Sequence, residues 1–204
     1  MTQPPIFILL SKPDNAFALQ WAMPITGLES NGQSAMPPGY GKAYDLYMTI
    51  DASGILHTDG TPPLYTSVNV TLWADPGADH GTPSSTVENG ARFSNGQTND
   101  IVLATGSLVS ATMSINPTTG DRSATYVETM TPTLDGTILL HGSIPTGSQL
   151  TEQFTTPADK FQALPQPDGT TVDLVNGGSA TVTLNTGNIM LPGLRFLHAL
   201  PAKG

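Results

Sequence analysis

The chain has 204 residues and a formal net charge of −9, with 7 Lys and Arg against 16 Asp and Glu. Only 11% of the residues are charged and 38% are hydrophobic, which excludes a disordered acidic tail and a charge-rich coiled coil. The few cations form no basic patch for nucleic acid, and no apolar run is long enough for a membrane span. We therefore predict one globular domain over residues 1–204, without a nucleic-acid or membrane partner.

The chain contains no cysteine, which excludes disulfides, thiolate metal ligands and cysteine nucleophiles. The apolar run at residues 5–10 is too short for the core of a signal peptide and lacks a basic flank. A composition rich in Thr, Ser, Asn and Gly is nevertheless typical of exported bacterial proteins. We expect a secreted or periplasmic protein whose leader is absent from this sequence, and a cytoplasmic location stays open.

Alternation of apolar and polar residues predicts the strands. The first alternating run is at about 16–23, and longer ones follow at 44–51, 67–75 and 109–115. Strict period two over seven or more residues is typical of a strand with one buried face. Turn residues at 116–121 and 134–137 divide residues 107–144 into three segments, which predicts a three-stranded antiparallel meander.

About nine strands are expected in all, and they indicate an all-β fold. We predict that the antiparallel meander forms a small barrel, and a two-sheet sandwich is the alternative. One short helix is expected near residues 157–164, where Pro157 suits the first helical position and Pro165 marks the end. Gly- and Pro-rich segments at about 26–43 and 75–99 are expected to be long loops of the kind that bind ligands.

Glu128 is the first candidate catalytic residue. In residues 124–131 it shares the even positions with Tyr126 and Met130, which places a carboxyl on the apolar, inward face. Burial raises the pKa of a carboxyl, so such a group suits acid–base chemistry near neutral pH. A β-bulge that shifts the register would instead place Glu128 in solvent.

His198 is the second candidate. It alternates with Leu194, Phe196 and Leu200, so a strand here would place the imidazole among apolar side chains. Glu128 and His198 would then converge inside the barrel, as catalytic acid and base. Inward aromatic and sulfur-containing side chains would bind the ligand: Trp21, Tyr44, Tyr126 and Met130.

A weaker metal candidate lies in the segment that follows Trp73. Asp75, Asp79 and His80 fall within six residues, but their spacing matches no calcium loop and no helical zinc motif. A turn rich in Asp is the competing interpretation. We therefore predict no metal and no other cofactor.

Two functions are consistent with these features. The first is a pocket protein for a small, largely apolar molecule, acting as a cofactor-independent lyase, isomerase or hydrolase. The second is a non-enzymatic structural or surface-interaction module that contacts carbohydrate or protein through its loops. The outward aromatic residues Tyr47 and Trp73 would need a loop or a partner subunit to cover them, so a homo-oligomer is also a hypothesis.

Overall fold

The alternating runs form the long strands of an antiparallel sheet. These strands are β2 (Ala16–Ile25), β5 (Tyr44–Ile55), β6 (Leu64–Pro76), β9 (Ile101–Ile115) and β10 (Arg122–Pro132). The computed structural model describes residues 6–11, 15–30, 33–34, 38–55, 57, 63–77, 83–86, 90–93, 99–139, 144–165, 167, 171–176, 179–185 and 194–197. All structural statements below refer to these residues.

The other strands of the sheet are shorter. They are β1 (Ile6–Ser11), β3 (Gly27–Ser30), β4 (Gln33–Ser34), β11 (Ser148–Thr156), β12 (Phe161–Pro165), β13 (Thr171–Asn176), β14 (Ser179–Asn185) and β15 (Leu194–Leu197). A separate hairpin consists of β7 (Pro83–Thr86) and β8 (Gly90–Phe93). The described helices are α1 (Leu134–Leu139) and one 3-10 turn, η1 (Ala158–Lys160).

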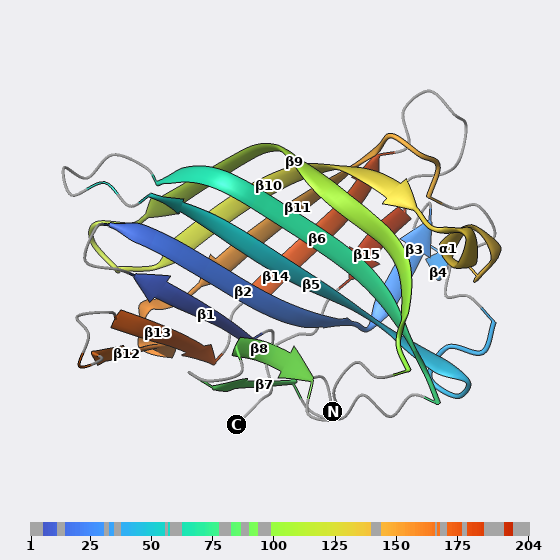
Figure 1. The fold of residues 1–204 in the computed structure, drawn as a ribbon, viewed down its shortest axis with the longest axis horizontal. Coiled ribbons are helices and arrows are strands. Elements are labelled where there is room, and N and C mark those ends of the chain that lie inside the picture. Colours follow the sequence, from blue (N-terminus) through green and yellow to red (C-terminus); the bar gives the residue numbers. More distant parts are fainter. Residues whose placement is uncertain are drawn as a thin grey trace.

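The sheet curls into a half-barrel (Figure 1). Its strand order is β12-β13-β1-β2-β5-β6-β9-β10-β11-β14-β15-β3-β4, which gives 13 strands in the described part of the chain. Only Thr26 separates β2 from β3, so the ladder that leaves β2 through β5 returns to the same stretch of chain when β15 pairs with β3. The predicted all-β antiparallel fold is confirmed. The expected number of about nine strands is roughly the number that forms the curled wall.

The core lies on the concave face of this wall. In β2, β5 and β6 most alternate residues point inward and are almost completely buried, as the pleat of a strand requires. In β9 and β10 full burial is confined to one half of each strand, residues 103–106 and 126–130. Each fully buried aliphatic side chain contributes about 1.5–3 kcal/mol through removal of apolar surface from water. The largest of these core residues include Met23, Ile25, Leu46, Met48, Ile50, Leu103, Met130 and Leu184.

Helix α1 forms where the second turn of the 107–144 meander and the start of its third strand were expected, and residues 140–143 lie outside the described residues. The hydroxyl of Thr133 accepts a hydrogen bond of 2.9 Å from the N–H of Gly136, which caps the helix, and donates one of 2.6 Å to the carbonyl of Val102. The N–H of Thr133 also bonds to the carbonyl of Leu103. These bonds dock the helix on β9, and the next strand of the wall is β11.

The helix expected near 157–164 was placed wrongly. Pro157 and Asp159 supply the start signals of a helix, but these produce only the 3-10 turn η1. The chain then enters β12, which pairs with β13 in antiparallel register. Sheet pairing at this edge prevails over the local helix signal.

The two segments expected as long loops also carry strands. β3 and β4 lie within 26–43, and the β7–β8 hairpin lies within 75–99. β8 packs against β2, and both hairpin strands contact β1. β3 and β4 therefore extend the large sheet, and the β7–β8 hairpin packs beside β1 and β2.

The outward aromatic Tyr47 is covered by its own chain. Its exposed fraction is 0%, its ring stacks on Trp73 at a centroid distance of 5.9 Å, and its hydroxyl donates a hydrogen bond to Asp100. The indole N–H of Trp73 donates to Thr49 at 2.9 Å. Burial of Tyr47 thus requires no partner subunit.

Gly136 gives a direct test of how α1 docks. A Cβ atom at this position would lie 1.8 Å from the carbonyl oxygen of Leu103, a backbone atom that side-chain rotation cannot move. We expect Gly136→Ala to lower the free energy of unfolding by about 1–3 kcal/mol or more, measured by urea denaturation. Asp135→Ala, at the exposed neighbouring position, is the control and should change it by less than about 0.5 kcal/mol. Equal stabilities of the two variants would contradict this docking.

Candidate functional site

Glu128 lies on the inward face of β10, as its alternation predicts. The exposed fraction of Glu128 is 0%, and the neighbouring inward residues Tyr126 and Met130 are 2% and 1% exposed. Neither carboxyl oxygen of Glu128 has a hydrogen-bond partner within the described residues. A polar group in this state carries a desolvation cost of about 1–3 kcal/mol even when it is neutral.

A β-bulge is present beside Glu128, but it does not turn the side chain outward. Val127 pairs with Ser110 and Glu128 pairs with Leu108, so the extra residue is Val109 on β9. Val109 is 54% exposed. The bulge therefore belongs to the partner strand, and β10 keeps its regular alternation.

Glu152 is a second buried carboxyl, on the next strand. It is also 0% exposed, and neither of its oxygens has a hydrogen-bond partner within the described residues. The register pairs Tyr126 with Glu152 and Glu128 with Leu150, so the two glutamates are diagonal neighbours on the inward face of β10 and β11. Diagonal neighbours of this kind lie roughly 7–8 Å apart, within reach of long side chains.

Burial raises the pKa of both carboxyls. For Glu128, desolvation raises the pKa from 4.5 to about 8. For Glu152, desolvation again raises the pKa well above its ordinary value, and the nearby charge of Glu128 raises it further. The second effect arises because two adjacent carboxylates in an apolar setting repel each other. Near neutral pH the pair is therefore mostly protonated, and Glu128 is the first to release its proton.

Two tyrosine hydroxyls lie in the same part of the core. Tyr126 and Tyr65 share a hydrogen bond of 3.0 Å between their buried hydroxyl groups, and their rings meet edge to face at 5.3 Å. Burial raises the pKa of Tyr126 well above its ordinary value, with further contributions from Tyr65, Glu152 and Glu128. Tyr126 is thus electrostatically coupled to both carboxyls and remains a neutral hydrogen-bonding group.

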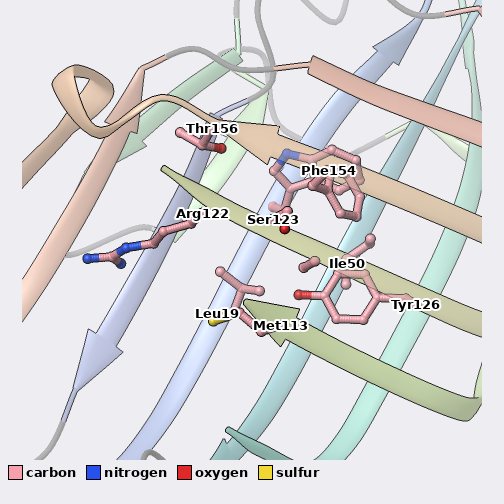
Figure 2. Close-up of a pocket in the computed structure, with 10 residues that line it drawn as sticks. Leu19, Ile50, Met113, Arg122, Ser123, Tyr126, Phe154 and Thr156 are labelled. Atoms are coloured by element: carbon pink, nitrogen blue, oxygen red, sulfur yellow. The ribbon is translucent and has the colours of Figure 1, made fainter. Parts of the chain in front are cut away.

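A partly open pocket lies beside Tyr126, on the side away from Glu128. Its volume is about 50 Å³, the space of one or two water molecules at roughly 30 Å³ each. Figure 2 shows side chains from facing walls of the half-barrel around it, from β2 and β5 on one side and from β9, β10 and β11 on the other. The lining residues are Leu19, Trp21, Ile50, Met113, Arg122, Ser123, Ala124, Tyr126, Phe154 and Thr156.

Aromatic rings in mutual contact form one wall of this pocket. Trp21 and Phe154 meet edge to face at a centroid distance of 4.1 Å, and Phe154 is 5.5 Å from the ring of Tyr126. Along the inward face of β10, Arg122 is followed by Ala124, Tyr126 and Glu128. The pocket and the carboxyl pair are therefore consecutive layers of one interior, and Tyr126 belongs to the boundary between them.

The structure brings together some of the predicted ligand-binding residues and separates others. Trp21 and Tyr126 both line the pocket. Met130 is buried deeper in the core, beyond Glu128 on β10, and does not line it. Tyr44 is the first residue of β5 and does not line the pocket, and its hydroxyl donates to the carbonyl of Pro38 at 3.2 Å.

The remaining predicted residues divide into two groups. His198, Asp79 and His80 lie outside the described residues, so the predicted approach of His198 to Glu128 stays a prediction. Asp75 is buried near the end of β6, opposite Asp45 in the register with β5. Among the described residues, no group of three or more acidic or His side chains is arranged to hold a metal ion.

Glu152, Phe154 and Arg122 were missed by the sequence-based prediction. Leu150, Glu152 and Phe154 alternate in the same way as Tyr126, Glu128 and Met130, so the same signal was present. The polar residues between them, Thr151 and Gln153, complete the period-two pattern of a strand. Arg122 lies two positions before the run from which the inward face of β10 was inferred.

The raised pKa values predict how stability depends on pH. In the unfolded chain Glu128 ionises near pH 4.5, whereas in the folded protein it does so only near pH 8. Unfolding therefore releases a proton between these values, and the stabilising contribution that is complete below pH 4.5 is lost as the pH rises toward 8. We expect the free energy of unfolding to fall by up to about 1.4 kcal/mol per pH unit for each such carboxyl.

Urea denaturation of Glu128→Gln and Glu152→Gln between pH 5 and 8 measures this slope. Each variant should show a shallower pH dependence than the wild type, whatever its absolute stability. Asp135→Asn, which removes a carboxyl from an exposed position, should retain the wild-type slope. Identical slopes in all four proteins would contradict the assignment.

Resemblance to known proteins supplies no further guide to this site. No helix among the described residues is long and apolar enough to cross a membrane. Comparison of the chain with protein-family models, with curated proteins and with solved structures finds no match.

Proposed function

We propose that this protein binds a small, largely apolar molecule in the pocket and transfers a proton on it with Glu128, without a cofactor. The observation that carries the proposal is the position of two buried carboxyls, without hydrogen-bond partners among the described residues, in the layer of the core next to an aromatic pocket. Retaining such groups in a core costs stability, and perturbed carboxyls beside a cavity are typical of catalytic acids and bases.

The two carboxyls suit different roles in this chemistry. Glu128 has a pKa of about 8, so near neutral pH it exchanges a proton readily in either direction. Glu152 is held in its protonated form by stronger desolvation and by Glu128. In this proposal Glu128 is the acid or base, and Glu152 keeps the pair from carrying two negative charges.

The pocket side of the site supports binding of an apolar group. Trp21, Phe154 and Met113 offer apolar surface, and the hydroxyl of Tyr126 offers a hydrogen bond. Proton transfer at a carbon or oxygen atom held near Tyr126 corresponds to a lyase, isomerase or hydrolase step that needs no metal. A non-enzymatic interaction module is the outcome if the tests below fail.

Hydrogen exchange of a small ketone tests the proton transfer. Cyclopentanone in D₂O exchanges the hydrogens next to its carbonyl when a base removes them, and NMR follows the loss of the proton signal. We expect the wild type to accelerate this exchange by about 10²-fold or more over buffer, with a rate that rises with pH to a plateau above pH 8. Glu128→Gln should reduce the rate to the buffer level, while Asp135→Asn retains it. Exchange that is equally fast in Glu128→Gln excludes Glu128 as the base.

A blocked pocket tests the location of binding. Ala124→Leu adds side-chain volume to the pocket lining, whereas Gln153→Leu adds it to an exposed outer position of β11. The ketone should raise the melting temperature of the wild type and of Gln153→Leu, because a ligand that binds only the folded state stabilises it. The shift should disappear in Ala124→Leu. An equal shift in both variants would place the binding elsewhere.

A further inference from the structure

The polar residues of the pocket lining are gathered at one end. Arg122 and Ser123 are the first residues of β10, and Thr156 is the last residue of β11, directly opposite Arg122 in the register. Toward Tyr126 the walls become aromatic and aliphatic. The hydroxyl of Ser123 bonds to that of Ser114 at 2.7 Å, so Arg122 and Thr156 supply the polar side chains at this end. This end, where Arg122 is partly exposed, is the mouth of the pocket, and the cavity surface beyond it is apolar, which matches a molecule with one polar end.

Arg122 makes the mouth of the pocket suitable for a negatively charged group of a ligand. Among the described residues that line the pocket it is the only cation, in a chain whose net charge is −9. In Figure 2 its guanidinium group extends from the start of β10, away from the rings of Phe154 and Tyr126. A guanidinium presents several N–H donors in a planar fork that matches a carboxylate, in addition to any contact that it already makes.

The apolar interior determines which end of the molecule enters. An anionic head placed near Tyr126 would lose its hydration in an apolar region, beside two carboxyls and without a cationic partner among the described lining residues. The same head at Arg122 would lie at the opposite end of the pocket. Electrostatics thus favours one orientation, with the head at the mouth and the apolar part inside.

We propose that the pocket accepts an amphipathic monocarboxylate, with its carboxylate on Arg122 and its apolar chain between Trp21 and Phe154. This inference rests on the proposed function, since it names the ligand class of the same pocket. The cavity volume of about 50 Å³ is about a third of the roughly 150 Å³ that encloses benzene in an engineered protein core. By that scale the enclosed part of the pocket holds on the order of two carbon atoms, and the rest of a short chain lies in the open part toward Arg122.

A series of probes with one chain length tests the head group. Hexanoate, 1-hexanol and hexylamine share a six-carbon skeleton and differ in charge, and calorimetric titration gives their dissociation constants. We expect hexanoate to bind at least 10-fold more tightly than hexanol, and hexylamine to bind most weakly. Arg122→Gln should weaken hexanoate at least 10-fold and leave hexanol unchanged, which also shows that the variant is folded. Lys160→Gln is the matched control, because Lys160 is an exposed cation that follows β11 and pairs with Asp159.

The outcomes separate this inference from the function on which it rests. If hexanol binds as tightly as hexanoate, or Arg122→Gln weakens both equally or neither, the carboxylate assignment is wrong, although an apolar pocket remains. If hexylamine binds most tightly, the pocket selects cations, and the assignment is again wrong. If no probe binds the wild type, both the inference and the proposed pocket are overturned. Weaker binding of hexanoate to Lys160→Gln than to the wild type would show that general surface charge, and not Arg122, attracts it.

Discussion

The cost of burying Glu128 and Glu152 together governs the interior of this half-barrel. Two ionised carboxylates without partners are not tolerated in an apolar core, so the fold depends on at least one of them holding its proton. The protonation state follows from the register, which places both side chains on the concave face of neighbouring strands. Space for them depends in part on Gly106, where a Cβ atom would lie 3.2 Å from the Cβ of Glu128 and 2.8 Å from the sulfur of Met130.

The same constraint links the carboxyl pair to the pocket. Tyr126 faces Glu152 across the strand pair, hydrogen-bonds to Tyr65 and also lines the pocket. A change of charge on the glutamates therefore acts on the inner wall of the pocket through Tyr126. Arg122 lies at the other end of the same strand face, so one end of the pocket carries a positive charge and the other adjoins the carboxyls. A proton donor or acceptor inside, apolar walls and a cation at the mouth are the features on which the proposed binding of a small amphipathic molecule rests.

Much of this arrangement was predictable from period-two alternation, because a strand with one buried face displays its register directly in the sequence. The inward position of Glu128 and the long strands were found in this way. Helix α1 was missed because Asp135-Gly136 resembles a hairpin turn, whereas the capping bonds of Thr133 to β9 depend on tertiary contact. The 157–164 segment shows the reverse error, since sheet pairing replaced most of a locally encoded helix. The proximity of Glu152 to Glu128 was not predictable, because it depends on which strands pair and in which register.

The protonation of the pair can be observed directly by NMR. The chain has only four glutamates, at positions 29, 88, 128 and 152, so selective ¹³C labelling of the glutamate carboxyls gives four signals that single substitutions assign. The signals of Glu128 and Glu152 should stay at the protonated chemical shift through neutral pH, and Glu128 should titrate with a midpoint of about 8. Titration of all four signals near the ordinary glutamate pKa of about 4.3 would contradict the buried pair and the chemistry proposed for it.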